Sequence, residues 1–186
     1  MSTKHNKTRK ATGWMMVSKI QFPDVRVLLV ERQPQNISLY RFALEDMGFG
    51  QLMFATNTEE AMDQMYFNRP SLIILGDELF PTPLSDFMEG IRSGKTGVPQ
   101  DVPVVIIAKH CTRTGIEKAR DCGVTEIVSL PLSAQSLRKR VCAALKTSRE
   151  FIDKTAYQGP DRRRRKAPSQ SSERRNSEQG EDHPQL

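Results

Sequence analysis

Short apolar runs alternate with longer amphipathic segments along the chain from residue 25 onward. Five runs predict strands, at 25–30, 52–55, 72–75, 102–108 and 125–130. Segments with helical spacing follow each of them, at 34–48, 56–67, 84–92, 112–123 and 134–147. The runs VLLV, LIIL and VVIIA lack the in–out alternation of a half-exposed sheet, so we expect strands that helices cover on both faces.

Local signals support the helices. The first helix places its apolar residues three and four positions apart, on one face, at Ile37, Tyr40, Leu44 and Met47. Gly48 stands where a C-terminal cap would lie, and Gly123 follows the fourth helix in the same way. Thr56 and Glu59 have the spacing of a capping box at the start of the second helix.

This alternation predicts a doubly wound α/β domain with a five-stranded parallel sheet. The flavodoxin-like strand order 2-1-3-4-5 is the expected one, and its ligand crevice lies at the carboxyl ends of the strands. The candidate residues at that edge are Glu31, Arg32, Gly76, Asp77, Ala108 and Leu130.

Charge is distributed unevenly along the 186 residues, whose net charge is +6. Residues 25–158 contain 16 Lys/Arg and 16 Asp/Glu, so the excess of basic residues lies near the two ends. We expect a flexible basic arm at 1–24, a folded domain at 25–148, and a linker with a disordered charged tail at 149–186.

The cysteines and the N-terminal region indicate a cytoplasmic location. Cys111, Cys122 and Cys142 form no CxxC pair and have no histidine at ligand spacing, which predicts neither a zinc site nor a disulfide framework. The first 24 residues contain an apolar run of only four residues, Trp14 to Val17, too short for a signal peptide or a membrane span.

Several segments resemble the receiver domain of bacterial two-component response regulators, over roughly residues 24–147. The similar pieces, in order, are VRVLLVERQP, LEDMGF, RPSLIILGDELFP, VPVVIIA and CGVTEIVSLPLSAQSL. The resemblance implies an aspartate at the end of the third strand that accepts a phosphoryl group. It also implies an acidic pair that holds Mg²⁺, a Ser or Thr hydroxyl at the end of the fourth strand, and a lysine before the proline that follows the fifth strand.

This chain departs from that pattern at most of these positions. The acidic pair reads Glu31 and Arg32, the hydroxyl position is Ala108, and Leu130 stands before Pro131 in place of the lysine. The position of the aromatic switch residue reads Ile127. A carboxylate can attack a phosphoryl donor only where cations neutralise the crowded negative charge, so these changes argue against ordinary phosphorylation.

The phosphoacceptor position itself has two candidates. An alignment without gaps from Pro70 to Arg92 places Gly76 there, whereas an alignment on the local motif places Asp77 there at the cost of one insertion and one deletion. The two differ by one residue, which in a strand turns a side chain to the opposite face. We favour the gapless alignment because the sheet restricts insertions more than the loop does.

The acidic residues of this edge also have two interpretations. Glu31, Asp77 and Glu78 could form a weak divalent-metal site, with Glu31 and Asp77 as its ligands, or a solvated rim in which Arg32 is salt-bridged. We favour the rim, since surface ion pairs of this kind are common. We therefore predict no cofactor, with Mg²⁺ required only if Asp77 is a working phosphoacceptor.

The sequence leads us to expect a degenerate receiver that acts as a cytoplasmic adaptor for signalling proteins and catalyses no reaction. The resemblance places the partner surface on the fourth helix, fifth strand and fifth helix. The cations there suggest an acidic partner; they are Lys118, Arg138, Lys139 and Arg140. An active phospho-receiver that uses Asp77 is the alternative, and the oligomeric state stays open.

A second alternative is nucleic-acid binding through the basic arms. The tail carries an uninterrupted run of cations, namely Arg162, Arg163, Arg164, Arg165 and Lys166. Against this alternative, the folded part is neutral and the tail beyond Tyr157 has no aromatic residue on which a base could stack. The run is also consistent with a docking peptide or with a solubilising tail.

Overall fold

The computed structural model describes residues 22–146, 151–154 and 157–161. Five parallel strands form one sheet in the order β2-β1-β3-β4-β5. Their bounds are β1 Phe22–Val30, β2 Phe49–Ala55, β3 Leu72–Gly76, β4 Val104–Ala108 and β5 Glu126–Ser129. The predicted doubly wound fold and its strand order are therefore confirmed.

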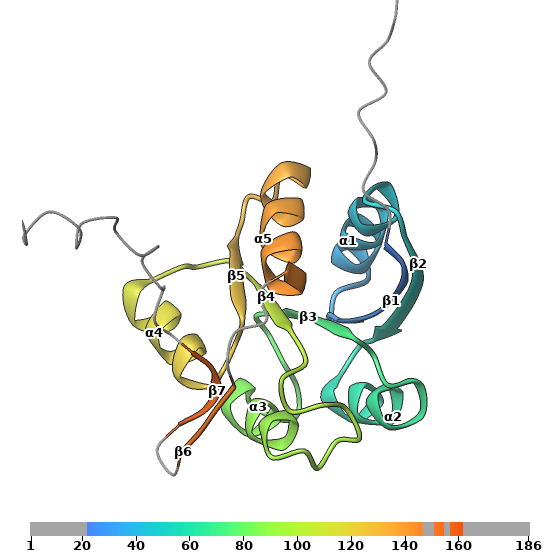
Figure 1. The fold of residues 1–186 in the computed structure, drawn as a ribbon. Helices are drawn as coiled ribbons and strands as arrows, with labels where there is room; N and C mark the ends of the chain where they lie inside the picture. The colour runs from blue at the N-terminus through green and yellow to red at the C-terminus, as the bar shows by residue number, and fades with distance from the viewer. Residues whose placement is uncertain (1–21, 147–150, 155–156, 162–186) are drawn as a thin grey trace, which may run out of the picture.

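Helices cover both faces of the sheet (Figure 1). Their bounds are α1 Pro34–Asp46, α2 Thr58–Asn68, α3 Leu84–Arg92, α4 Arg113–Asp121 and α5 Ala134–Lys146. Helices α1 and α5 pack on one face, and α2, α3 and α4 pack on the other. All five strands end at the same edge because every pair of neighbouring strands is parallel.

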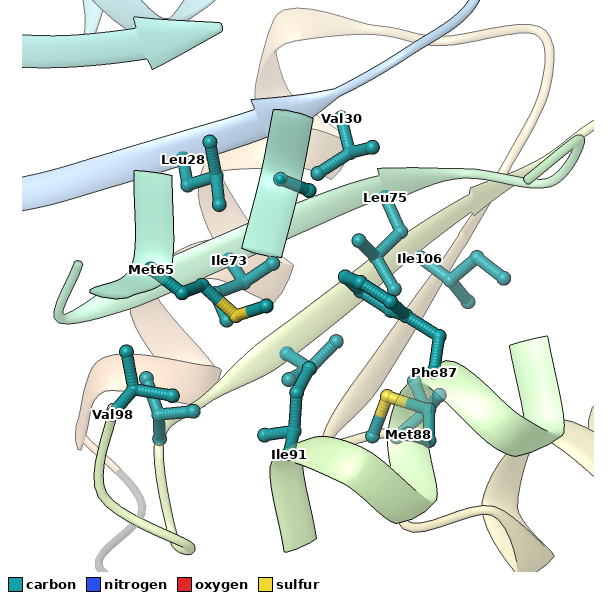
Figure 2. Packing of buried hydrophobic residues seen from close by; sticks show 14 of the residues in the cluster. Leu28, Val30, Met65, Ile73, Leu75, Phe87, Met88, Ile91, Val98 and Ile106 are labelled. Carbon is teal, nitrogen blue, oxygen red and sulfur yellow. The ribbon is translucent and has the colours of Figure 1, made fainter. Parts of the chain in front are cut away.

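The core consists of two layers, one on each face of the sheet. Successive residues of β3 alternate between them, so Ile73 and Leu75 face α2 and α3 while Leu72 and Ile74 face α1 and α5. Figure 2 shows the first layer, in which Met65 and Phe87 pack onto β3. The continuous apolar runs of the sequence are thus strands that are buried on both sides.

The helix ends follow the sequence signals, with one correction. Gly48 and Gly123 both have positive φ, at 88° and 85°, as expected of residues that end helices. The capping pair of α2 lies one residue later than predicted, since the Asn57 side chain accepts a hydrogen bond from the Glu60 amide at 2.8 Å. Glu60 in turn accepts one from the Thr56 amide at 2.7 Å, which lowers the pKa of its carboxyl group.

Both expected domain boundaries differ from the structure. Strand β1 begins at Phe22, inside the expected arm. The Phe22 ring stacks on the Phe49 ring, and their centroids are 4.7 Å apart. Residues Phe151–Lys154 and Tyr157–Pro160 form an antiparallel hairpin, β6 and β7, inside the segment 149–186 that was expected to be a disordered tail. The expectation of disorder therefore does not hold for this hairpin.

Close backbone contact joins the hairpin to the domain. A Cβ atom on Gly159 would lie 2.9 Å from the Cα of Gly123, so only glycine permits the observed approach. Beside this contact, the buried Arg92 donates hydrogen bonds to the Gly123 carbonyl at 2.8 and 3.2 Å. It also donates to the carbonyls of Gln100 and Val102, at 2.6 and 2.8 Å, and so joins α3 to the segments that precede β4 and β5.

Candidate functional site

Four strands bring the predicted positions to one edge of the sheet. In the registers of the sheet, Val30 lies beside Leu75, Gly76 beside Ile107, and Ala108 beside Ser129. Glu31 follows β1 directly, and the Leu130 amide donates a hydrogen bond to the Ala108 carbonyl at 3.0 Å. The structure thus gathers Glu31, Gly76, Asp77, Ala108 and Leu130 at the carboxyl ends of the strands.

Gly76 faces Glu31. A Cβ atom on Gly76 would lie 2.6 Å from Oε2 of Glu31, a distance shorter than van der Waals contact. The carboxylate is 7% exposed, and its Oε1 accepts a hydrogen bond from the Gln33 amide at 2.9 Å. The Glu31 side chain therefore fills the space into which a side chain at position 76 would point.

Asp77, one residue beyond β3, is directed elsewhere. Its Oδ2 accepts a hydrogen bond from the backbone amide of Lys109 at 2.7 Å. This bond fixes the half-buried carboxylate against the connection between β4 and α4. A side chain at position 76 would thus point to Glu31, whereas that of Asp77 contacts the Lys109 amide. This difference between adjacent positions is the one that the two alignments implied.

Lys109 places an ammonium group at this edge, which the sequence analysis did not anticipate. Its Nζ forms an ion pair with Glu78 at 2.7 Å. Hydrogen bonding to Glu78 raises the pKa of Lys109, and the negative charges of Asp77 and Glu31 raise it further. The same hydrogen bond lowers the pKa of Glu78. The sequence signal was a lysine directly after Ala108, but the partner lies 31 residues away.

Arg32 forms no direct salt bridge with Glu31, Asp77 or Glu78, but after Lys109 its charge contributes to the lowered pKa of Glu78. Its guanidinium lies over the ring of Phe80, 5.5 Å from the centroid, and both residues are exposed. The Phe80 carbonyl accepts a hydrogen bond from the Thr58 amide at 2.9 Å, so the loop after β3 is attached to the start of α2. Arg32 thus stacks on the aromatic ring of that loop.

Tyr40 of α1 contributes a buried hydroxyl near the acidic residues. Burial raises the pKa of Tyr40 to about 12, and the charges of Glu31 and Asp77 contribute to the rise. The periodicity of the first helix predicted that Tyr40 would face inward. Its position near the carboxylates depends on how α1 packs on the sheet.

Each carboxylate of this edge already has a hydrogen-bond partner. Mg²⁺ requires near-octahedral oxygen ligands and is usually held by one or two carboxylates together with waters. Glu31 and Asp77 each accept a backbone hydrogen bond, and Glu78 is paired with Lys109. Within the described part of the chain, no cluster of three or more Asp, Glu, His or Cys residues is arranged to hold a metal ion.

The positions at which the resemblance placed a phosphorylation switch carry apolar side chains. Ala108 and Leu130 offer neither a hydroxyl nor an ammonium group at the edge. Ile127 is half-buried and packs against the core layer of α2, α3 and α4. Neither Ala108 nor Ile127 can therefore exchange hydrogen bonds between two conformations.

A groove of about 540 Å³ runs along the outer strand of the sheet, between α4 and α5. We call it the β5 groove. Its lining includes five charged side chains and one aliphatic side chain. They are Glu117, Arg120, Asp121, Glu126, Ile127 and Arg140. Residues of β7 line it as well.

The four cations expected on one partner surface do not lie together. Arg140 lines the β5 groove and donates a hydrogen bond to Glu126 at 2.9 Å. Arg138 points toward α1, where its Nη2 lies 3.9 Å from a carboxylate oxygen of Asp46. The remaining two, Lys118 and Lys139, are exposed and are not among the residues that line the groove.

Two other expectations fall partly or wholly outside the described residues. The basic run Arg162 to Lys166 lies beyond them, as does most of the expected N-terminal arm.

Among the helices that the structure describes, none has the length and apolar content required to cross a bilayer.

Several similar solved structures are receiver domains. One is the signal receiver domain of a protein assigned as a Luxo repressor from Vibrio parahaemolyticus, with a TM-score of 0.58 and 23% identity, and the match covers 66% of this chain and 90% of that one. The fold is that of a receiver domain. A second match is the receiver domain of a sensor histidine kinase from Pseudomonas aeruginosa, with a TM-score of 0.55, 18% identity, and coverage of 62% and 92%.

A third similar receiver domain belongs to a modulated diguanylate cyclase from Desulfovibrio desulfuricans, with a TM-score of 0.55, 20% identity, and coverage of 66% and 94%. The structure from Pseudomonas aeruginosa has a magnesium ion coordinated in its active-site cleft. No protein-family model and no curated protein matches this chain. The expected receiver fold is thus confirmed at the level of architecture.

Proposed function

We propose that this chain is a degenerate receiver, a signalling adaptor that binds partner proteins and neither accepts a phosphoryl group nor catalyses a reaction. One observation carries the proposal, which is that Glu31 fills the space in front of Gly76. A phosphoacceptor at that position needs a carboxylate and a free volume for the incoming phosphoryl group. Here a glycine supplies no nucleophile, and a buried anion occupies the volume.

The charge balance of the edge supports the same conclusion. Phosphoryl transfer requires cations that are free to stabilise the transferred charge. Lys109 is already paired with Glu78, and Arg32 stacks on Phe80. The carboxylate of Asp77 accepts a hydrogen bond from the Lys109 amide. These contacts of Arg32, Asp77 and Lys109 stabilise one arrangement of the loops that follow β1, β3 and β4.

A receiver without a polar switch has a fixed partner surface. Receivers transmit phosphorylation by shifting a two-state element, and such a shift needs groups that exchange partners between the states. Ala108 and Ile127 have no polar side-chain atoms. We therefore assign the β5 groove as a docking surface for signalling proteins. The shape of this groove does not depend on a phosphoryl group.

Phosphorylation is tested directly with the intact chain. The protein is incubated with Mg²⁺ and acetyl phosphate, or with a histidine kinase, and its intact mass is measured beside that of Asp77→Asn. No stable phosphoryl adduct is expected on either protein. An adduct on the wild type that is absent from Asp77→Asn would overturn the proposal and establish an active phospho-receiver.

The partner surface is tested with two charge reversals on one helix. Arg140→Glu changes the β5 groove, whereas Arg138→Glu changes the side of α5 that faces Asp46. In affinity purification from cells that express the protein, Arg140→Glu should lose partners that Arg138→Glu retains. Equal retention by both variants would contradict the assignment of the groove.

The same proposal places the adaptor in the cytoplasm. All three cysteines are free thiols in the structure, and Cys111 is exposed. Exposed free thiols persist in a reducing compartment and are oxidised elsewhere. A fusion to a redox-sensitive fluorescent protein should therefore report reducing surroundings, and an oxidised signal would contradict this location.

A further inference from the structure

Strand β2 forms one edge of the sheet, and its outer side pairs with no strand that the structure describes. The Ala55 carbonyl accepts a hydrogen bond from the Glu31 amide at 3.0 Å, so the backbone groups of Ala55 face β1. Backbone groups point to alternate sides along a strand, and those of Gly50, Leu52 and Phe54 therefore point outward from the sheet. These three residues are arranged symmetrically about Leu52.

The outer edge of β2 lacks the features that commonly prevent strands from pairing. Residues Phe49–Ala55 read FGQLMFA, with neither a charged residue nor a proline. Proteins often place a lysine, a proline or a bulge on such an edge. The register of β2 with β1 is irregular only between Phe22 and Arg26, so the stretch from Gln51 to Ala55 is regular. Strand β2 therefore offers a regular, uncharged edge to another strand.

This edge is complementary to itself. When two identical strands pair in antiparallel orientation about Leu52, Gly50 of one copy lies opposite Phe54 of the other. Among the described residues beyond its chain neighbours, no atom lies within 4 Å of the place where a Cβ atom on Gly50 would stand. Leu52 and Phe54 are half-buried on the same face of the sheet. The Phe54 ring of one copy can therefore cover the open glycine of the other, a cross-strand pair that protects glycine in sheets.

Charge does not oppose the approach of two copies. Residues 25–158 contain 16 Lys/Arg and 16 Asp/Glu, so the folded parts do not repel each other through net charge. Antiparallel pairing of identical strands places a central charge near its own copy, which is unfavourable, and β2 has no such charge. Beside the edge, Arg41 lies over Phe54 and is paired with Glu45 at 2.8 Å. The strand and this ion pair together carry no net charge.

We propose that two copies of this chain pair through β2, antiparallel about Leu52, so that their two five-stranded sheets become continuous. A two-fold axis relates the copies, as in most homodimers. Leu52 exchanges backbone hydrogen bonds with Leu52 of the other copy, and Gly50 exchanges them with Phe54. One strand from each copy forms most of the contact, so its area falls in the class of weak, reversible interfaces.

The dimer gives the proposed adaptor two binding sites, and this consequence rests on the proposed function. Strands β2 and β5 are the opposite edges of the sheet, so pairing through β2 leaves both β5 grooves open. A partner with two docking sites would then bind with avidity. Dimerisation is measured without any partner, and Arg140→Glu should still dimerise. A dimer whose groove variants bind partners normally would refute the adaptor surface alone.

Dimerisation is tested by sedimentation equilibrium on the full-length chain at a series of concentrations. Wild type should change from monomer to dimer as the concentration rises. Gly50→Lys should stay monomeric, because the lysine would lie opposite Phe54 of the other copy. Gly50 is exposed and has no positive φ, so this variant should keep the wild-type melting temperature. The matched control, Gln135→Lys, adds the same charge at an exposed position on α5 and should dimerise as wild type does.

Hydrogen exchange tests the pairing itself. The amides of Leu52 and Phe54 should exchange more slowly as the concentration of wild type rises, and should exchange fast in Gly50→Lys at every concentration. The Met53 amide faces β1 and should be protected in both proteins. In a mixture of ¹³C-labelled and unlabelled protein, intermolecular NOEs should join the Gly50 Hα atoms to the Phe54 ring.

Three results would overturn the proposal. The first is a wild type that stays monomeric at every concentration. The second is a dimer that Gly50→Lys forms as readily as wild type or that shows no NOE between Gly50 and Phe54, since such a dimer uses another surface or register. The third is protection of the Leu52 and Phe54 amides in the monomer, which would show that another part of the same chain covers the edge.

Discussion

A side chain added at position 76 tests whether that position faces Glu31. The Cβ atom of Gly76→Ala would lie 2.6 Å from Oε2 of Glu31, so the carboxylate must move. Gly76 has no positive φ, and alanine therefore fits the backbone conformation. The consequence of the substitution should depend entirely on what stands at position 31.

The magnitude follows from two opposing contributions. Displacing Glu31 disrupts the hydrogen bond that its Oε1 accepts from the Gln33 amide at 2.9 Å. A hydrogen bond to a charged group contributes about 1.5–3 kcal/mol to stability. Replacing glycine by alanine in a strand contributes about 0.5–1 kcal/mol in the opposite direction. Gly76→Ala should therefore lower the free energy of unfolding by about 1–2 kcal/mol.

The effect should change sign when Glu31 is shortened. In a Glu31→Ala background there is no carboxylate to displace, and Gly76→Ala should raise stability by about 0.5–1 kcal/mol. In a Glu31→Gln background the side chain has the same size, so Gly76→Ala should remain destabilising. The Gln background thus separates the steric effect from the effect of charge.

The assay is equilibrium unfolding in urea for the six proteins, with circular dichroism and fluorescence as separate probes. The coupling between the two positions should be about 2 kcal/mol, which lies within the range of residues in direct contact. Gly76→Ala effects that agree within about 0.5 kcal/mol across the three backgrounds would refute the geometry. The argument that Glu31 blocks the phosphoacceptor position would fail with it.

Three further predictions concern groups that the fold brings together. Tyr40 has a pKa of about 12 in the folded protein, above its ordinary value of 10, so the folded state retains this proton to higher pH than the unfolded chain does. Below pH 10 the free energy of unfolding should therefore keep this contribution, and between pH 10 and pH 12 it should fall by about 2 kcal/mol more than that of Tyr40→Phe. The same pH dependence in urea unfolding of both proteins would contradict this. Arg92→Ala removes a buried charged donor from three backbone carbonyls and should lower the free energy of unfolding by about 3–5 kcal/mol, whereas the exposed Arg120→Ala should change it by less than about 0.5; a loss below about 1 kcal/mol for Arg92→Ala would show that its hydrogen bonds are dispensable. Gly159→Ala forces a Cβ atom to within 2.9 Å of the α4–β5 backbone, so hydrogen exchange at the hairpin amides should accelerate about tenfold or more while core amides keep their protection. Gln158→Ala, at the exposed neighbouring position, is the matched control, and equal exchange in both variants would argue against a docked hairpin.

The sequence by itself determined the layout of the domain. Runs such as LIIL at 72–75 are buried because every residue is apolar, and a strand buried on both faces tolerates no other pattern. The ends of α1 and α4 followed from Gly48 and Gly123, because glycine adopts positive φ without strain. These features depend on neighbours a few residues apart, which a linear pattern records.

The sequence also named the positions that gather at the sheet edge, but not their contacts. The spacing left Gly76 and Asp77 as alternatives, since a shift of one residue reverses the direction of a side chain in a strand. Packing of β3 between β1 and β4 decides which of them meets Glu31. Lys109 and Glu78 become partners only because β3 and β4 are adjacent in the sheet.

The hairpin and the partner surface depended on tertiary structure most of all. Residues 151–160 continue no periodic apolar pattern, and a two-stranded hairpin alone is marginally stable, so the local sequence predicted a linker. The contact of Gly159 with Gly123 supplies what the local sequence lacks. Likewise, Arg138 and Arg140 are two residues apart in sequence, but two residues turn about 200° around a helix, so one meets α1 and the other β5. Composition records the charge of such residues, and only the packing of the helix decides which surface receives it.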